Sequence, residues 1–152
     1  MKKTIAWIGE IDRRPEAFRR LVEHYRLIWV IQEEVSTDPS TIENPLPEVE
    51  LVNCAKDGCW EADLIILAGE LIHQELLEKI REVSTQKIVI IITAEDKVDG
   101  KKRVLSIKEA LSFSKIVEVV MSSEEAQILG VNPGALATAK DIVQLLGYGV
   151  RM

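Results

Sequence analysis

The chain has 152 residues, of which 47% are hydrophobic and 29% are charged, and its formal net charge is −6. This length fits one domain with a sizeable core, and this composition excludes a disordered or fibrous protein. The negative charge argues against a broad nucleic-acid interface, which needs clustered Lys and Arg. No apolar run reaches the roughly 18 residues that span a bilayer, and no signal-peptide cleavage site follows Met1-Lys2-Lys3. We therefore expect a cytoplasmic protein without nucleic-acid or membrane partners.

Short apolar runs and helical spacing alternate along the sequence, which predicts alternating strands and helices. In the first half, strands are predicted at residues 5–8, 27–31, 49–52 and 62–68. Pro15 suits the first turn of a helix between the first two of these strands. Residues 36–48 contain three of the five prolines among small polar residues, so we predict an irregular connection there in place of a full crossover helix.

The alternation continues in the second half of the chain. The predicted elements are a helix with an apolar stripe from Leu71 to Ile80, strands at residues 88–92 and 116–120, and a charged loop at 94–103. Ser106 followed three residues later by Glu109 has the spacing of a capping box. This pair predicts the start of a short helix that ends near Phe113.

The last predicted helix is the one with the clearest ends. Asn132 and Pro133 suit the cap and the first turn, and Gly147 suits the termination. A final edge strand is predicted at residues 148–150.

Six or seven short strands that alternate with helices predict one three-layer α/β domain over residues 1–152, with a mostly parallel sheet and helices on both faces. Ligands bind such sheets beyond the carboxyl ends of the strands, where the strand order reverses. The loops expected around this crevice are residues 9–14, 32–36, 69–71 and 93–96.

The cysteines and histidines do not form a recognisable metal site. Cys54 and Cys59 are separated by four residues, and neither His24 nor His73 has a neighbouring ligand at suitable spacing. We expect two reduced thiols, two exposed helical histidines and no bound metal. The three tryptophans, Trp7, Trp29 and Trp60, are predicted to be core or interface residues.

The order of segments resembles the Rossmann domain of the deazaflavin-dependent NADP reductase and pyrroline-carboxylate reductase superfamily. The matching stretches are Ile5-Ala6-Trp7-Ile8-Gly9, Ala62 to Ala68, Lys87 to Ile92, and Asn132-Pro133-Gly134-Ala135 leading to Leu145-Leu146-Gly147-Tyr148. The resemblance implies a three-layer Rossmann-like fold and NAD or NADP as the cofactor.

The phosphate loop of such domains is incomplete in this sequence. Of its three glycines only Gly9 is present, and Ile11 and Arg14 stand near the positions of the other two. The branched side chain of Ile11 would occupy the space of the pyrophosphate. Glu10 adds a like charge, which at about 4 Å repels by roughly 4 kcal/mol at an effective dielectric near 20. The sequence therefore predicts a degenerate phosphate loop that repels a diphosphate unless arginine compensates.

A second departure concerns catalysis. Many relatives continue into a helical domain that supplies the substrate site and dimer contacts, and this sequence ends where such a domain would begin. We therefore expect no substrate domain here, and the catalytic residues are unassigned.

The remaining candidate site residues each have a structural alternative. Arg13 and Arg14 offer planar donors to a phosphate, whereas Asp12 beside them is suited to accept the free N–H groups at the start of a helix. In the second reading the protein supplies its own anion.

Acidic residues follow two of the predicted strands. Glu33 and Glu34 lie about 24 residues beyond Gly9, near the spacing of an acid that binds a ribose diol, which favours NAD over NADP. Gly69 and Glu70 end a buried strand beside the crevice, where Glu70 would contact a ligand. The alternative for Glu33 and Glu34 is that they are exposed acids on a loop. The alternative for Glu70 is that it is an acid at the amino terminus of a helix without a ligand.

Three functions are consistent with these observations. The first is a small nucleotide-binding module that uses the crevice without a standard phosphate loop. The second is a non-catalytic protein-interaction module that acts as a homo-oligomer, most simply a homodimer. The third is a small NAD(P)-dependent oxidoreductase, which ranks last because fold alone does not establish chemistry.

Overall fold

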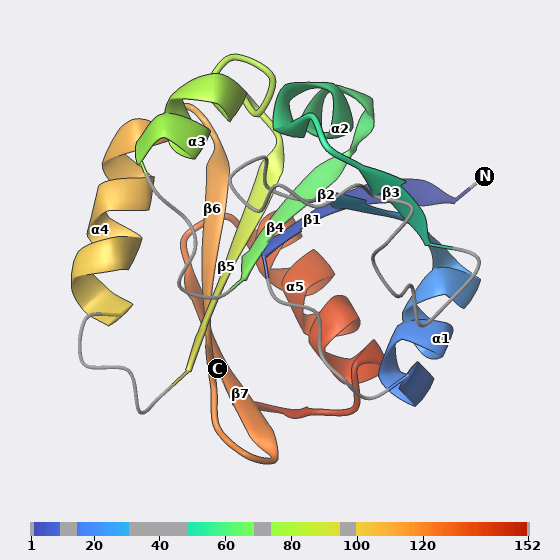
Figure 1. Cartoon of the computed structure of the whole chain (residues 1–152). Helices are drawn as coiled ribbons and strands as arrows, with labels where there is room; N and C mark the ends of the chain where they lie inside the picture. Colours follow the sequence, from blue (N-terminus) through green and yellow to red (C-terminus); the bar gives the residue numbers. More distant parts are fainter. Residues whose placement is uncertain (1, 10–14, 31–48, 69–73, 95–99, 152) are drawn as a thin grey trace.

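The computed structural model of the chain describes residues 2–9, 15–30, 49–68, 74–94 and 100–151. These residues form one eight-stranded sheet with helices on both of its faces (Figure 1). The strands are β1 (Lys3–Gly9), β2 (Tyr25–Val30), β3 (Glu50–Val52), β4 (Leu64–Ala68), β5 (Ile88–Ala94), β6 (Lys115–Met121), β7 (Glu125–Gly130) and β8 (Gly149–Arg151). The helices are α1 (Pro15–His24), α2 (Ala55–Glu61), α3 (Gln74–Ile80), α4 (Gly100–Ala110) and α5 (Pro133–Leu145). In this part of the chain no helix combines the length and the apolar character needed to cross a membrane.

The strand order is β3-β2-β1-β4-β5-β6-β7-β8. Neighbours from β3 through β6 are parallel, β7 is antiparallel to β6, and β8 is parallel to β7. The order reverses between β1 and β4, because the chain first builds outward through β2 and β3 and then returns to the other side of β1. This topology confirms the predicted α/β class and the mostly parallel sheet.

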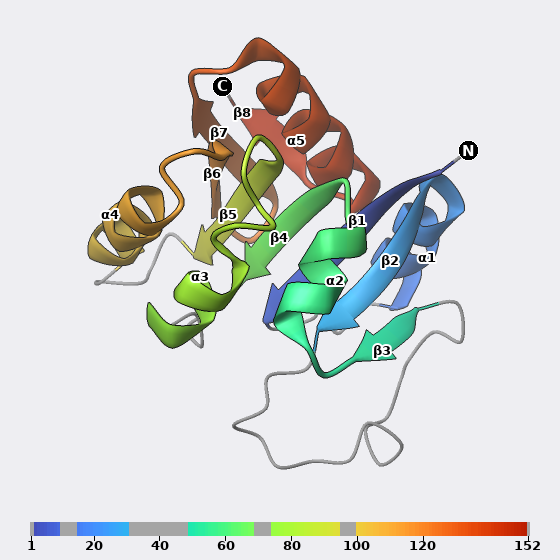
Figure 2. The same cartoon turned by 90° about the horizontal axis from the view of Figure 1, so that it is seen from above.

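The sheet is buried on both faces, which explains the continuous apolar runs of its central strands. Every residue of β4 is buried. In β1, Ile5 and Trp7 belong to the core beneath α1 and α5, whereas Ala6 and Ile8 belong to the core beneath α2, α3 and α4. Figure 2 shows these two groups of helices on opposite sides of the sheet. The sequence alternation thus divides one set of strands between two apolar cores.

The predicted strands are confirmed with ends that differ by no more than two residues from the observed ones. The last helix also ends and begins as predicted. Asn132 Oδ1 accepts a hydrogen bond from the Ala135 N–H at 2.9 Å, and Pro133 occupies the first turn. Gly147, just beyond the helix, has a φ of +94°, which glycine adopts at low cost.

The prediction for the start of α4 is wrong. The helix already begins at Gly100, inside the predicted charged loop, so Ser106 and Glu109 lie within it and do not form a capping box. Val104, Ile107 and Leu111 are buried and hold one face of the helix against the sheet. Tertiary burial of these three side chains therefore outweighs the polar character of the first turn.

Two further elements were not predicted. Helix α2 is only seven residues long, and its Gly58 lies so close to β2 that a Cβ there would be 2.9 Å from Val30 Cγ2. Strand β7 alternates buried Ala126 and Ile128 with exposed Gln127 and Leu129. That period of two is a strand signal, but it is short and lacks the strong apolar run that marks the parallel strands.

The predicted connection at 36–48 and the start of the predicted helix at Leu71 lie outside the described residues.

Candidate functional site

Gly9 lies at the point where the strand order reverses. It ends β1 and is paired in register with Ala68, which ends β4. Its φ is +115°, and a Cβ at this position would lie 1.7 Å from the Ala68 carbonyl oxygen. A side chain therefore cannot be accommodated while β1 and β4 remain adjacent. The structure explains the first glycine of the motif by the close approach of two strand ends.

Trp29 reaches the same carboxyl edge from β2. Its half-buried indole donates a hydrogen bond from Nε1 to the Gly9 carbonyl oxygen at 3.2 Å. This contact crosses from β2 to the end of β1, beside the crevice that the topology predicts. The sequence predicts a core or interface position for Trp29, and nothing in the local pattern indicates that its N–H reaches Gly9.

Aromatic side chains fill the contact between α1 and the sheet. Trp7 from β1 and Phe18 from α1 pack edge to face, with ring centroids 5.1 Å apart and an interplanar angle of 68°. Both are buried, and Trp29 packs against the same core. In dinucleotide-binding domains, the third glycine of the motif serves to bring this helix close to this strand. Here the Trp7 and Phe18 rings fill the contact between β1 and α1.

Thr93 is a buried polar residue at the same edge of the sheet. It follows Ile92, which is paired in register with Ala68, and it is 9% exposed. Its position in β5 alternates with Ile92, which places its side chain on the face covered by α3 and α4, together with Val89 and Ile91. Among the described residues, the Thr93 hydroxyl has no hydrogen-bond partner. A buried hydroxyl without a partner is costly, which makes Thr93 a candidate contact for a ligand at the carboxyl edge.

Of the predicted site residues, the structure places only Gly9. The other predicted site residues lie outside the described part of the chain: Arg13, Arg14, Glu33, Gly69 and Glu70. Asp12, the alternative to a phosphate at Arg13 and Arg14, also lies outside it. The predictions for their roles stay predictions.

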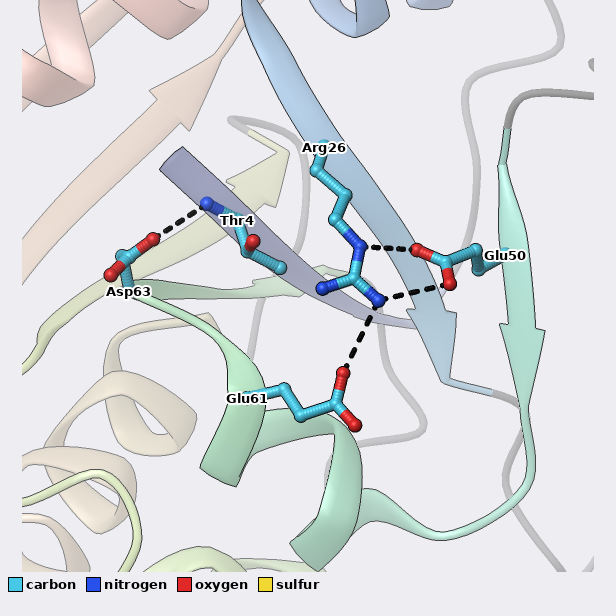
Figure 3. Close-up of polar contacts among 5 residues, drawn as sticks. All are labelled: Thr4, Arg26, Glu50, Glu61 and Asp63. Carbon is cyan, nitrogen blue, oxygen red and sulfur yellow. Dashed lines mark hydrogen bonds and ion pairs between the residues drawn. The ribbon is translucent and has the colours of Figure 1, made fainter. Parts of the chain in front are cut away.

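The opposite, amino edge of the sheet carries a cluster of charged side chains, shown in Figure 3. Asp63 Oδ2 accepts the Thr4 N–H at 2.7 Å, and the Asp63 N–H donates to the Thr4 carbonyl oxygen at 2.8 Å. These two bonds join the start of β1 to the residue before β4. They satisfy backbone groups of Thr4 and Asp63, so the Asp63 carboxylate has a structural role.

Arg26 bridges two acidic side chains at the same edge. It donates to Glu50 through Nε at 2.5 Å and through Nη2 at 2.9 Å, and it donates to Glu61 at 3.3 Å. The hydrogen bond from Arg26 lowers the pKa of Glu50 below its ordinary value and raises the pKa of Arg26. Arg26 therefore links β2, β3 and α2 as a structural contact, and because one guanidinium faces two carboxylates, one negative charge stays unbalanced.

Lys87 closes the carboxyl end of α2. Its Nζ donates to the carbonyl oxygens of Cys59 at 2.6 Å and Trp60 at 3.1 Å, where the last carbonyls of a helix lack partners within it. Burial lowers the pKa of Lys87. Burial also raises the pKa of the Cys59 thiol to about 12, so this thiol stays protonated at neutral pH.

The other residues singled out from the sequence are placed as follows. Cys54 and Cys59 are both free. In the part of the chain that the structure describes, no group of three His, Cys, Asp or Glu side chains could hold a metal ion. His24 is exposed at the end of α1, as predicted, and His73 lies outside the described residues. Trp7 is in the core, but Trp60 is 72% exposed, because α2 ends there with its buried face on Gly58 and Cys59.

Searches for protein families and for curated proteins find no match to this chain. Solved structures do match. An imine reductase from Myxococcus stipitatus in complex with NADP+ superposes with a TM-score of 0.66 at 11% identity, over 97% of this chain and 54% of the reductase. Pyrroline carboxylate reductase from Plasmodium falciparum with NADP bound gives 0.64 at 14% identity, over 98% of this chain and 56% of that one. The chain has a Rossmann fold.

A hypothetical protein from Sinorhizobium meliloti has a similar fold, with a TM-score of 0.64 at 15% identity, over 99% of this chain and 84% of its own. The present Rossmann domain spans only a little more than half the length of the two reductases. At these identities the likeness establishes the fold alone. It confirms the structural resemblance to pyrroline-carboxylate reductases that the order of segments indicated.

Proposed function

We propose that this chain is a nucleotide-binding module whose ligand lies across β1 and β4 at the carboxyl edge of the sheet. The observation that carries the proposal is the reversal of strand order at Gly9 and Ala68. In parallel α/β sheets, ligands bind in the crevice outside such a reversal. Similar folds with NADP or NADP+ bound make NADP or NAD the first ligands to test.

The buried Thr93 hydroxyl is the described group best suited to contact a ligand there. It lies one strand beyond β4 and has no partner among the described residues. A ligand that supplies a donor or acceptor would satisfy it. In this proposal Arg13 and Arg14 bind a phosphate, Glu33 binds a ribose hydroxyl, and Gly69 with Glu70 borders the crevice.

The aromatic contact between α1 and the sheet bears on how the ligand is held. Trp7 and Phe18 fill the contact between β1 and α1, and the sequence has Ile11 and Arg14 near the positions of the second and third glycines. The pyrophosphate therefore lacks the usual close glycine turn. We expect side-chain donors to carry more of the binding than in a standard dinucleotide site, with affinity that falls as salt concentration rises.

A titration tests the proposal. NADP+, NADPH, NAD+, NADH and adenine nucleotides are added to the protein, and the melting temperature and tryptophan emission are recorded. A ligand at 100 times its Kd adds about 2.7 kcal/mol to the free energy of unfolding. Trp29 donates to Gly9, so its emission should change on binding, and a Trp60→Phe background removes the exposed indole.

Two matched variants locate the site. Thr93→Val replaces a buried hydroxyl at the carboxyl edge, and Thr4→Val makes the same change at a similarly buried residue of the amino edge. We expect roughly threefold to tenfold weaker binding in Thr93→Val and none of this loss in Thr4→Val. Equal effects in the two variants would contradict a ligand at the carboxyl edge. If every nucleotide leaves the melting temperature and the emission unchanged, the proposal fails.

A small NAD(P)-dependent oxidoreductase is the second candidate, favoured by the likeness to two reductases. It requires nucleotide-dependent turnover that disappears when Glu33 or Glu70 is replaced. Turnover that survives both replacements removes these residues from the chemistry.

A further inference from the structure

Strand β8 is the outermost strand of the sheet on the side of β6 and β7. It pairs with β7 through Glu125 and Gly149, Ala126 and Val150, and Gln127 and Arg151. No strand among the described residues pairs with its outer side. An open edge presents a row of unpaired N–H and C=O groups, which proteins often protect with Lys, Pro or a bulge. Strand β8 contains no Lys and no Pro, and its protection is limited to its length of three residues and the charge of Arg151.

The backbone directions in β8 are determined by one hydrogen bond. The Gly149 N–H donates to the Glu124 carbonyl oxygen at 3.0 Å, toward β7. Successive residues of a strand direct their backbone groups to opposite sides, so the N–H and C=O of Val150 point outward. Val150 is therefore the residue whose backbone is available for a further strand.

The exposed face of this edge carries one ion pair. Arg151 donates to Glu125 Oε2 through Nη2 at 2.6 Å and through Nε at 3.2 Å, and their side chains are 68% and 55% exposed. They border a depression of about 20 Å³, room for a water molecule and too small for a ligand. Gly149, directly beside Glu125 in the register, contributes no side chain.

We propose that β8 pairs antiparallel with β8 of a second copy of this chain, about a two-fold axis at Val150. The two Val150 residues then exchange a pair of N–H···O=C bonds, and their side chains lie opposite each other. In this register Arg151 of each copy lies opposite Gly149 of the other. The missing side chain at Gly149 leaves a path for Arg151 to Glu125 of the second copy.

Charge complementarity selects a second copy as the occupant of this edge. Two Glu125 and two Arg151 side chains alternate around the axis, so a neutral group of four charges forms in which each Arg151 lies between its own Glu125 and that of the second copy. This is the self-complementary pattern of a two-fold interface. The contact is short, and we expect a weak dimer with a Kd in the micromolar range or above, further weakened by salt. The inference does not depend on nucleotide binding.

Sedimentation equilibrium at low salt, over a range of protein concentrations, tests the dimer. Val150→Pro removes the outward N–H, and proline is tolerated on an edge strand where the N–H faces solvent. We expect wild type to dimerise and Val150→Pro to be monomeric and folded, with a melting temperature lowered by the lost packing of the partly buried Val150 side chain. A wild-type protein that is monomeric up to about 1 mM overturns the proposal, as does a dimer that persists in Val150→Pro.

Charge reversal separates the contact between copies from the ion pair within one chain. Glu125→Arg and Arg151→Glu each bring like charges together in a homodimer, so each variant alone should be monomeric. In an equimolar mixture, the unlike chains restore both contacts between copies while the pair within each chain stays broken. We expect the mixture to dimerise. If it stays monomeric while both variants melt as wild type does, the proposed register is wrong.

Discussion

At the amino edge of the sheet, charged side chains are bound to one another or to backbone groups, whereas at the carboxyl edge the described residues include a buried hydroxyl without a partner. Asp63 holds Thr4, and Arg26 holds Glu50 and Glu61. At the other edge, Thr93 is buried and unpaired among the described residues. The two edges belong to the same strands, yet the polar groups of the amino edge stabilise the fold, whereas the Thr93 hydroxyl at the carboxyl edge has no partner among the described residues.

This difference shows that a cluster of ionisable residues need not be a functional site. The Arg26 cluster has the residue types of a binding site, but its arginine is already bound to two carboxylates of the same chain and supports the fold. The carboxyl edge has little charge among its described residues and instead has the strand reversal and Gly9. We therefore expect substitutions at the amino edge to change stability and substitutions at Thr93 to change binding.

The largest expected effect is at Gly9. Gly9→Ala should lower the free energy of unfolding by more than about 3 kcal/mol, because the new Cβ adds a clash with Ala68 to a strained φ. Urea denaturation measures the change. Gly134→Ala is the control, since a Cβ in α5 would meet only Asn132 Oδ1 at 3.4 Å. Similar stability in the two variants would contradict the close approach of β1 and β4.

The next effect is at Asp63. Asp63→Ala leaves the Thr4 N–H without its side-chain acceptor and should cost about 1 to 2 kcal/mol of unfolding free energy. Asp63→Asn keeps an acceptor oxygen and should recover most of the loss. Nucleotide affinity should be the same in both variants. A loss of affinity that exceeds the loss of stability would assign a ligand role to the amino edge.

Tyr25, the first residue of β2, gives a pH-dependent prediction. Its hydroxyl donates to Asp141 at 3.0 Å, and burial, with the hydrogen bond and charge of Asp141, raises its pKa to about 12. The folded state therefore holds this proton more tightly than the unfolded state, whose tyrosine pKa is about 10. The resulting stability is complete below pH 10 and is lost as pH rises through 12.

Tyr25→Phe tests this assignment. It should cost about 1 kcal/mol near neutral pH through loss of the hydrogen bond. Its unfolding free energy should fall less steeply than that of wild type between pH 10 and 12. Parallel curves for the two proteins over that range would show that Tyr25 titrates normally.

The smallest effect is at Arg26 and Glu50. Both side chains are nearly half exposed, so a double-mutant cycle with Arg26→Ala and Glu50→Ala should give a coupling of about 0.5 to 1 kcal/mol, reduced by salt. Because Arg26 lowers the pKa of Glu50, the coupling should be complete above the ordinary glutamate pKa of about 4.3. It should disappear as pH falls through the lower pKa of the folded state. A coupling that does not change with salt or acid would exclude an ion pair.

Much of the fold could be predicted because its signals are local. The apolar runs of β4 and β5 report burial on both faces, and Asn132 with Pro133 marks the start of α5 by short-range hydrogen bonding. The start of α4 could not be predicted in this way. Its first turn is polar and Gly100 indicates a loop, so only the burial of Val104 and Ile107 against the sheet reveals the helix.

The candidate site was predictable in position more than in detail. The alternation of strands and helices predicts a crevice at the carboxyl edge, and Gly9 stands there as expected. The indole of Trp29 on Gly9 could not be foreseen, because the two residues are 20 positions apart and only strand pairing brings them together. The sequence predicts Thr93 only as part of the crevice loop at residues 93–96, because a sequence does not show whether a hydroxyl has a hydrogen-bond partner.

By itself the sequence determined the α/β class, the central strands and the last helix, because apolar periodicity and capping act within a few residues. Tertiary structure alone decided that Gly9 must lack a side chain against Ala68 and that Asp63 holds Thr4, 59 positions away. It also decided that the Val150 backbone faces outward. These properties depend on which strands become neighbours, and that choice is made by burial across the whole sheet.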